Sequence, residues 1–140
     1  MIRTERISAI MTADVHAVQV DAAPSQVRDL LRHHRFHHVP VLDGGIVVGM
    51  LSSADVAALG LEAWGVDEQT VDAELDASFD LRALMSHDVV TAHPDEPVLR
   101  AAELLADGSI HAIPVVNGKN ELVGLVTSTD LIRYLYHAFR

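Results

Sequence analysis

The sequence contains no cysteine. The chain can therefore form no disulfide, no thiolate metal site and no site with a cysteine nucleophile. A chain without cysteine is most easily placed in a reducing compartment, and on this ground we expect a cytoplasmic protein.

Basic residues are scarce as well. Ten of them stand against twenty acidic residues, which gives a formal net charge of −10 at pH 7. Such a surface repels a polyphosphate backbone, so we expect no nucleic-acid partner. A small nucleotide is not excluded, because a few local donors can hold one phosphate group.

Long hydrophobic runs are also missing. The first residues carry charges at Arg3, Glu5 and Arg6 and resemble neither a signal peptide nor a membrane span. Apolar runs elsewhere, such as Ile46 to Leu51, have the length of a core strand. We expect no membrane association, and 140 residues are enough for one compact core.

The sequence repeats one pattern twice. Residues 7–15 (ISAIMTADV) parallel residues 81–89 (LRALMSHDV). Each segment is followed by a proline, Pro24 or Pro97, that opens a stretch with apolar residues at i, i+3 and i+4. This spacing is typical of a short amphipathic helix.

A second pair of matching segments follows in each half. Residues 38–42 (HVPVL) and 112–116 (AIPVV) are mostly apolar and contain a proline. A glycine-containing turn leads from each to a further apolar run. The order of apolar run, turn and apolar run predicts a β-hairpin. A Ser/Thr-x-x-Asp sequence then opens another helix. Each half is too small to bury both of its faces, so we expect the halves to pack together through their sheets.

The repeats divide the chain into residues 1–59, a connector over 60–80, and residues 81–140. The connector holds seven acidic residues and neither lysine nor arginine. Its acidity is explained either by a solvated face or by a surface for a basic partner.

Part of the connector has helical spacing. Val71, Leu75 and Phe79 recur every four residues, which predicts a helix that lies on the rest of the module. We place its start near Asp67, because a carboxylate is favourable at a helix N-terminus.

Two segments carry a resemblance to a known family. They are Gly49-Met-Leu-Ser52-Ser-Ala-Asp55 and Gly124-Leu-Val-Thr127-Ser-Thr-Asp130, each preceded by a hydrophobic-Pro-Val segment. In matching order and spacing they resemble the tandem CBS (cystathionine-β-synthase) domain family over nearly the whole chain except the connector. The resemblance implies an α+β fold, with two βαββα motifs related by a pseudo-twofold axis and two clefts between them.

The resemblance also implies a function. Members of this family often bind an adenosine-containing ligand, such as AMP, ADP, ATP or S-adenosylmethionine, and often pair into disc-like dimers through their helices. We therefore expect a regulatory ligand sensor that forms a homodimer and acts on an effector protein that the sequence does not identify. The alternative is a protein-interaction or dimerisation module whose clefts are vestigial.

Each Ser/Thr-x-x-Asp has two explanations. At the start of a helix, its hydroxyl and carboxylate can cap the first turn without any ligand. Its two carboxylate oxygens also match the two donors of a ribose 2′,3′-diol, and such charge-assisted hydrogen bonds are strong. By the resemblance, Asp55 and Asp130 are the ribose ligands, next to Ser52 and Thr127.

The segment before each family proline is expected to line the adenine, because an extended backbone leaves N–H and C=O groups free for a base edge. The resemblance combines the Ser/Thr-x-x-Asp of one half with the pre-proline segment of the other. One cleft would then use Thr127 and Asp130, and the other Ser52 and Asp55. The expected base-lining residues are Phe36, His37 and His38 in the first half and Ile110, His111 and Ala112 in the second.

The remaining candidates make the two clefts unequal. Thr91 matches a family position whose hydroxyl often faces the ligand, and its counterpart lies near Ala17. Arg133 follows Asp130 by three residues and can reach a phosphate or simply pair with that aspartate, whereas Ala58 holds the corresponding place in the first half. Histidines of the pre-proline segments could also hold a phosphate, which would make binding pH-sensitive near neutrality.

The sequence argues against two other classes of site, a metal site and a catalytic site. Residues 33–38 (HHRFHH) suggest a metal site, but the repeat places a helix end near His34 and a strand near His38, so helical spacing should not persist. Histidines at a helix C-terminus also suit the helix dipole. No catalytic constellation or Gly-rich phosphate loop can be identified. We therefore expect no enzyme, no native metal site and no required cofactor.

Overall fold

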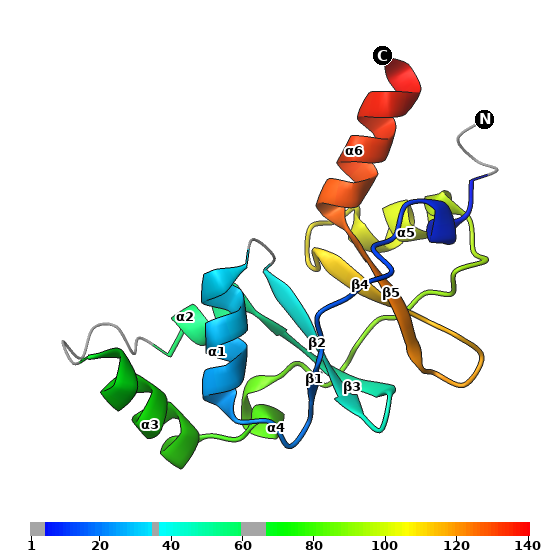
Figure 1. The fold of residues 1–140 in the computed structure, drawn as a ribbon. Coiled ribbons are helices and arrows are strands. Elements are labelled where there is room, and N and C mark those ends of the chain that lie inside the picture. The colour runs from blue at the N-terminus through cyan, green and yellow to red at the C-terminus, as the bar shows by residue number, and fades with distance from the viewer. Residues whose placement is uncertain (1–4, 35–36, 60–66) are drawn as a thin grey trace. The chain divides into compact units, whose positions relative to one another are not determined.

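A computed structural model describes residues 5–34, 37–59 and 67–140 (Figure 1). The chain forms two compact units. The first-repeat unit comprises His16–Gly44 and Val48–Asp88, and the second-repeat unit comprises Met1–Val15, Gly45–Val47 and Val89–Arg140.

The first-repeat unit is built on a three-stranded sheet in the order β1-β2-β3. β1 (Val18–Gln19) runs parallel to β2 (His38–Asp43), and β3 (Ile46–Ser52) follows β2 after a turn. α1 (Pro24–His33) joins the first two strands, and α2 (Ser53–Ala57) begins where β3 ends. The alternate burial along β3 shows that one face of that strand packs on the core.

The second-repeat unit has the same order of elements. β4 (Ala112–Val116) pairs antiparallel with β5 (Leu122–Thr127), and α6 (Ser128–Phe139) begins where β5 ends. α5 (Val98–Leu105) precedes β4. In place of a first strand, Ala92 forms a parallel bridge with Val115 of β4. The α+β class and the predicted hairpins and helices are therefore confirmed.

The opening segment of each repeat packs in the unit of the other repeat. Ile7 lies in a short 3₁₀ helix (Ile7–Ala9) and is fully buried in the second-repeat core, while Leu81 of α4 (Leu81–Leu84) is fully buried in the first-repeat core. The methionine that follows each of them, Met11 or Met85, lies against a glycine. A Cβ built on Gly124 would be 2.4 Å from the Met11 Sδ, and one on Gly49 would be 2.4 Å from the Met85 Sδ.

The connector contains the predicted helix. α3 (Glu68–Ser78) has Asp67 as its N-cap, and the Asp67 carboxylate accepts a hydrogen bond of 2.8 Å from the Thr70 N–H. Val71 and Leu75 are buried as the spacing predicts. Phe79 differs, because it lies one residue beyond the helix, where the helical spacing has ended, and is 36% exposed.

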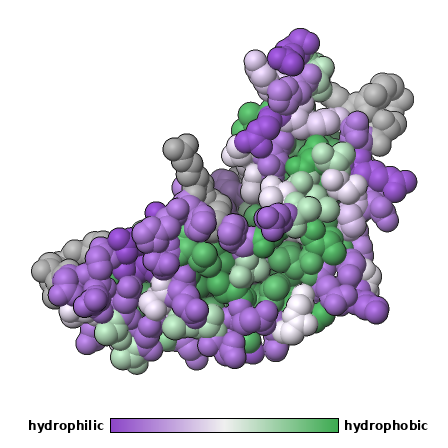
Figure 2. Space-filling model, viewed as in Figure 1, coloured by the Kyte–Doolittle hydropathy of each residue, from purple (hydrophilic) through white to green (hydrophobic). Residues whose placement is uncertain are grey.

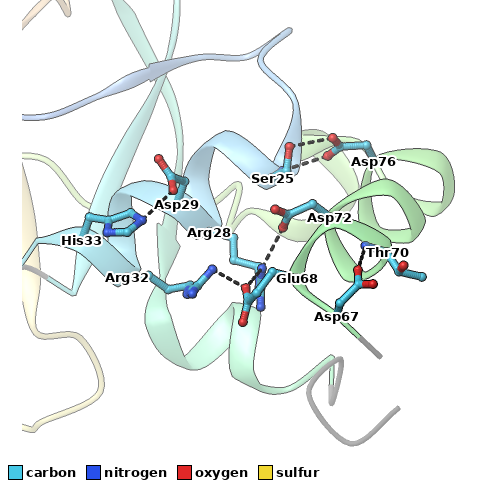
Figure 3. Close-up of polar contacts among 10 residues, drawn as sticks. All are labelled: Ser25, Arg28, Asp29, Arg32, His33, Asp67, Glu68, Thr70, Asp72 and Asp76. Carbon is cyan, nitrogen blue, oxygen red and sulfur yellow. Dashed lines mark hydrogen bonds and ion pairs between the residues drawn. The ribbon is translucent and has the colours of Figure 1, made fainter. Parts of the chain in front are cut away.

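α3 packs against α1, as the close-up in Figure 3 shows. α1 supplies the donors and α3 the carboxylates of this contact. The Arg28 Nη1 lies 2.7 Å from the Asp72 Oδ1 and 3.0 Å from the Glu68 Oε2. The Ser25 N–H and hydroxyl donate to the Asp76 carboxylate at 2.8 and 2.6 Å. The connector is thus tied to the first-repeat unit by polar contacts as well as by Val71 and Leu75.

None of the helices in the described part of the chain combines the length and the apolar character that crossing a bilayer requires.

Candidate functional site

Both Ser/Thr-x-x-Asp sequences form a reciprocal cap. The Ser52 Oγ accepts from the Asp55 N–H at 3.1 Å, and the Asp55 Oδ2 accepts from the Ser52 N–H at 2.9 Å. In the second repeat, the Thr127 Oγ1 accepts from the Asp130 N–H at 3.1 Å, and the Asp130 Oδ2 accepts from the Thr127 N–H at 2.8 Å. The structural explanation of these sequences is therefore confirmed, since the hydroxyl and carboxylate of each motif cap α2 or α6.

The caps use one carboxylate oxygen of each aspartate. Among the described residues, none bonds to the Asp55 Oδ1, while the Asp130 Oδ1 lies 3.4 Å from the Arg133 Nη1. An ionised carboxylate has about four lone-pair sites, so both aspartates keep acceptor capacity beyond the cap. The two positions differ, because Asp130 already shares its second oxygen with a guanidinium.

Each pre-proline segment lies at the start of the following helix of its own repeat. The His37 carbonyl accepts from the Ser53 N–H at 2.9 Å, and the His111 carbonyl accepts from the Ser128 N–H at 3.0 Å. The His37 Nδ1 also lies 3.5 Å from the Ser53 hydroxyl. Within each unit, the expected base-lining segment and the expected ribose ligand are therefore brought together. The combination across the two repeats stays a prediction.

The sequence pattern did not single out Ser53 and Ser128. Each is the residue after the capping Ser or Thr, and its N–H is the donor that joins the helix start to the pre-proline segment. The signal was present in the repeat, since serine occupies this position twice. Only the backbone geometry shows why the position matters.

The other candidates lie in or beside the strands of each unit, where the structure describes them. His38 begins β2 and Ala112 begins β4, where Ala112 pairs in register with Thr127. Ile110 is half-buried and packs against the second-repeat core. Thr91 precedes the bridging residue Ala92, as Ala17 precedes β1, so the predicted equivalence of Thr91 and Ala17 is confirmed. Phe36 lies outside the described residues.

Arg133 pairs with Asp130, which is the simpler of its two predicted roles. Asp55 has no such guanidinium partner among the described residues, because Ala58, the C-cap of α2, stands at the equivalent position. The two sites are therefore unequal, as the sequence indicates. The side chains of His37 and His111 are exposed.

The histidine-rich stretch is divided as the repeat predicts. α1 ends at His33, whose Nε2 lies 2.9 Å from the Asp29 Oδ1, and the ring of His34 lies 4.8 Å from that of His16. β2 begins at His38, so the helical spacing stops before it. Within residues 5–34, 37–59 and 67–140, no three His, Asp or Glu side chains are grouped so as to hold a metal ion.

The sequence matches the family model of the CBS domain over residues 7–62 and again over residues 81–137. It is 31% identical over 121 residues to the CBS domain-containing protein YhcV of Bacillus subtilis, covering 86% of this chain and 79% of that protein. It is 30% identical over 131 residues to a homoserine O-acetyltransferase of Methanococcoides burtonii, covering 92% of this chain and 24% of that enzyme. The chain thus spans about a quarter of the length of that relative.

Solved structures have the same fold. The CBS domain pair of protein MJ0100, in complex with 5′-methylthioadenosine and S-adenosyl-L-methionine, matches with a TM-score of 0.78 and 25% identity over 96% of this chain and 98% of that chain. CBSX2 in complex with AMP matches with a TM-score of 0.79 and 22% identity over 96% of this chain and 98% of that chain. At 22% identity, the second likeness concerns the fold alone.

Proposed function

The chain belongs to the CBS domain family, and from this premise we propose that it is a regulatory module that binds an adenosine-containing ligand. One observation carries the proposal. Both repeats place a Ser/Thr-x-x-Asp carboxylate and the backbone of a pre-proline segment at the same helix start. A carboxylate for a diol and backbone groups for a base edge are the two kinds of group that an adenosine needs.

The residues of the proposed sites are those that the sequence indicates. Asp55 and Asp130 accept the ribose hydroxyls, because the oxygen outside each cap retains its acceptor capacity. The pre-proline segments line the base, with His37 and His111 nearest the helix starts. We place each ligand in a cleft between the two motifs, with the pre-proline segment of one repeat facing the aspartate of the other. Phe36, His38, Ile110, Ala112 and Thr91 complete the proposed lining.

The phosphate end of the ligand would meet few positive charges. Of the described residues, Arg133 is the guanidinium beside a proposed site, and Asp130 already holds it. The chain is also strongly acidic, which disfavours a highly charged anion. These observations favour S-adenosylmethionine or AMP over ATP. The 25% identical MJ0100 pair, which is complexed with 5′-methylthioadenosine and S-adenosyl-L-methionine, supports the same ranking.

The test is a thermal-shift panel of adenosine, AMP, ATP, S-adenosylmethionine and 5′-methylthioadenosine, followed by calorimetric titration of the best ligand. A ligand at a hundred times its Kd stabilises the folded chain by about 2.7 kcal/mol, which is a shift of several degrees. We expect ATP not to be among the three compounds that give the largest thermal shifts. A panel without any shift would contradict the sensor function.

Substitution of the aspartates separates ligand binding from folding. Asp55→Asn and Asp130→Asn each keep an oxygen that can accept the cap hydrogen bond but lose the charge that strengthens the bonds to a diol. We expect affinity to fall about 10- to 100-fold with a nearly unchanged melting temperature of the free protein. Gln26→Glu in α1 serves as a surface control whose affinity should stay the same. If all variants bound the ligand with the affinity of the wild type, neither aspartate would be part of the ligand site.

Two further parts of the proposal concern partners. We propose that the module forms a homodimer through its helices and passes the ligand signal to an effector protein, with no catalysis of its own. The alternative function is an interaction module with vestigial clefts. It would be favoured if the panel gave no shift while the chain still dimerised.

A further inference from the structure

The two capping aspartates differ in the residue that stands one turn further along each helix. Three residues after Asp130, Arg133 places its Nη1 3.4 Å from the Asp130 Oδ1. Three residues after Asp55, Ala58 is exposed and carries no charge. The two repeats therefore differ in charge beside the carboxylate oxygen that accepts no cap bond. We call the proposed ribose positions at these aspartates the Asp130 site and the Asp55 site.

The ion pair between Arg133 and Asp130 is loose. A guanidinium that holds a carboxylate firmly lies at about 2.8 Å, which is shorter than the 3.4 Å of this pair. The Arg133 side chain is 62% exposed, whereas that of Asp130 is 10% exposed. Along the visible side of α6, hydrophilic residues in purple reach the surface (Figure 2). Exposed pairs of this spacing contribute little to stability, so a ligand can replace the guanidinium at small cost.

A displaced Arg133 side chain would stay beside the start of α6. Side chains of a helix tilt toward its N-terminus, and Arg133 reaches back in this way to Asp130, the third residue of α6. The arginine stem is long and flexible, and its guanidinium carries five donors. A ribose that donates its 2′,3′-diol to Asp130 carries its 5′ substituent on the same ring. That substituent is then the nearest new partner for the guanidinium.

The charge of the 5′ substituent decides how well the ligand suits Arg133. A 5′-phosphate accepts charge-assisted hydrogen bonds and replaces the carboxylate that the guanidinium has lost. A 5′-methylthio group offers no charge, and the sulfonium of S-adenosylmethionine brings a second positive charge close to the first. A single guanidinium also matches a single phosphate group. Arg133 thus favours a nucleoside monophosphate.

The Asp55 site favours the opposite charge. The Asp55 Oδ2 accepts the cap bond, and none of the described residues bonds to the Oδ1. Residues 36–81 contain neither lysine nor arginine. The described arginines of the first-repeat unit each pair with a carboxylate of α3 or with Asp43: Arg28, Arg32 and Arg82. The Asp55 carboxylate therefore repels a phosphate and attracts a positively charged ligand.

We infer that Arg133 selects different ligands for the two sites. The Asp130 site takes an adenosine with one 5′-phosphate, and the Asp55 site takes an adenosine whose 5′ group is uncharged or positively charged. This rests on the proposed function, in which both aspartates bind a ribose. The module then senses two classes of adenosine ligand rather than one.

Variants with one remaining site assign the ligands. Asp55→Asn leaves the Asp130 site, and Asp130→Asn leaves the Asp55 site. Calorimetric titration of each variant with AMP, 5′-methylthioadenosine and S-adenosylmethionine gives the ratios of the Kd values. We expect Asp55→Asn to bind AMP at least 10-fold more tightly than S-adenosylmethionine, and Asp130→Asn to show the reverse order. The same order in both variants would overturn the selection.

Removal of the guanidinium tests Arg133 directly. In the Asp55→Asn background, Arg133→Gln should weaken AMP binding about 10-fold and change the affinity for 5′-methylthioadenosine by less than twofold. Arg140→Gln is the matched control, because it removes the same charge from the end of the same helix, about 10 Å further along. Its affinity for AMP should stay within twofold. Equal effects of the two substitutions would mean that Arg133 acts only through the total charge of the chain.

A transplanted arginine provides the converse test. In the Asp130→Asn background, Ala58→Arg places a guanidinium three residues after Asp55, and the exposed position leaves room for it. We expect AMP to bind about 10-fold more tightly and S-adenosylmethionine more weakly. Ala58→Gln adds a side chain without charge and should leave both affinities unchanged. An unchanged ratio of affinities in Ala58→Arg, with the melting temperature of the free protein retained, would contradict the selection.

The proposed function and the selection of ligands fail in different ways. If none of the three compounds bound to the wild type, the sensor function would be wrong and the selection with it. If the compounds bound and each aspartate mattered, but both sites ranked the compounds alike, the sensor function would stand and Arg133 would not select the ligand.

Discussion

Gly124 shows how closely the opening segment of the first repeat approaches the second-repeat unit. A Cβ at this position would lie 2.4 Å from the Met11 Sδ and 3.1 Å from the Thr12 carbonyl oxygen. The thioether can move, but the Thr12 carbonyl is held in place as part of the backbone. The Thr12 N–H donates to the Leu125 carbonyl at 2.8 Å, and the Thr12 carbonyl accepts from the Leu125 N–H at 2.9 Å. We therefore expect Gly124→Ala to lower the free energy of unfolding by about 1–2 kcal/mol, measured by urea denaturation.

The chain offers a control for this substitution. Nothing lies within 4 Å of a Cβ built on Gly118, so Gly118→Ala should change stability by less than about 0.5 kcal/mol. Met11→Ala removes the side chain that meets the new methyl group. The double variant Met11→Ala/Gly124→Ala should therefore cost less than the sum of the single variants. If the losses in the free energy of unfolding were additive, contact with the Met11 thioether would not be the cause of the loss in Gly124→Ala.

At the scale of elements, Arg28 joins α1 to α3. Burial by itself lowers the pKa of the Arg28 guanidinium, but its hydrogen bonds to Asp72 and Glu68 and their charges outweigh this and raise the pKa above its ordinary value. The side chain is thus charged at every pH of interest. Arg28→Ala leaves two carboxylates without this partner and opens a gap between the helices. We expect a loss of about 2 kcal/mol in the free energy of unfolding.

Arg32→Ala is the comparison for that substitution. The Arg32 side chain is 42% exposed and meets the Glu68 carboxylate, which is 59% exposed, so the pair is largely hydrated. Exposed ion pairs contribute little, and the expected loss is below about 1 kcal/mol. Equal losses for the two arginines would show that burial of Arg28 adds nothing to the contact.

The cap of α3 should make the stability of the fold sensitive to acid. The hydrogen bond from the Thr70 N–H holds the pKa of the Asp67 carboxyl below its ordinary value. Because folding lowers the pKa of Asp67, its ionised carboxylate stabilises the fold at pH values above the ordinary carboxyl pKa of about 4. This contribution is lost as the pH falls through the lower pKa of the folded state. Asp67→Asn keeps a good cap that does not titrate. Between neutral pH and about pH 3, the urea midpoint of Asp67→Asn should therefore fall less than that of the wild type. Parallel curves would contradict this role.

The sequence predicted the existence of α3. It did not predict that α3 packs on the side of α1 that carries Arg28. The spacing of Val71 and Leu75 and the carboxylate of Asp67 are local signals, and they were sufficient for the start and the buried face of the helix. Arg28 gave the opposite signal, because an arginine in an amphipathic helix is normally assigned to the exposed side. Its burial depends on Glu68 and Asp72, which lie far along the chain. Only the tertiary structure brings those charges together.

The same limit applies to the candidate site. The repeat predicted Asp55 and Asp130 and the segments before the prolines, because these residues form short, recognisable patterns. It did not reveal the bonds from Ser53 to His37 and from Ser128 to His111, because they join a helix start to a strand start about sixteen residues away. Local spacing carries no information on such contacts. The pattern therefore identified the parts of each site but not how they connect.

At the scale of the whole molecule, the proposed cleft requires one ligand to contact residues of both repeats. The structure joins the Asp130 helix to His111 of the same repeat, whereas the proposal sets Asp130 against His37 of the other. A double-mutant cycle on ligand affinity separates these arrangements, because residues that touch the same ligand couple and distant ones add.

We expect Asp130→Asn and His37→Ala to couple by more than about 0.5 kcal/mol in calorimetric titrations. Asp130→Asn with His33→Ala is the control pair, since His33 ends α1 and lies outside the proposed sites. Coupling of Asp130 to His111 alone would place the ligand within one repeat. In that case the ligand could not link the two repeats. Any signal to an effector would have to arise within the second-repeat unit, through α6, whose first turn contains Asp130.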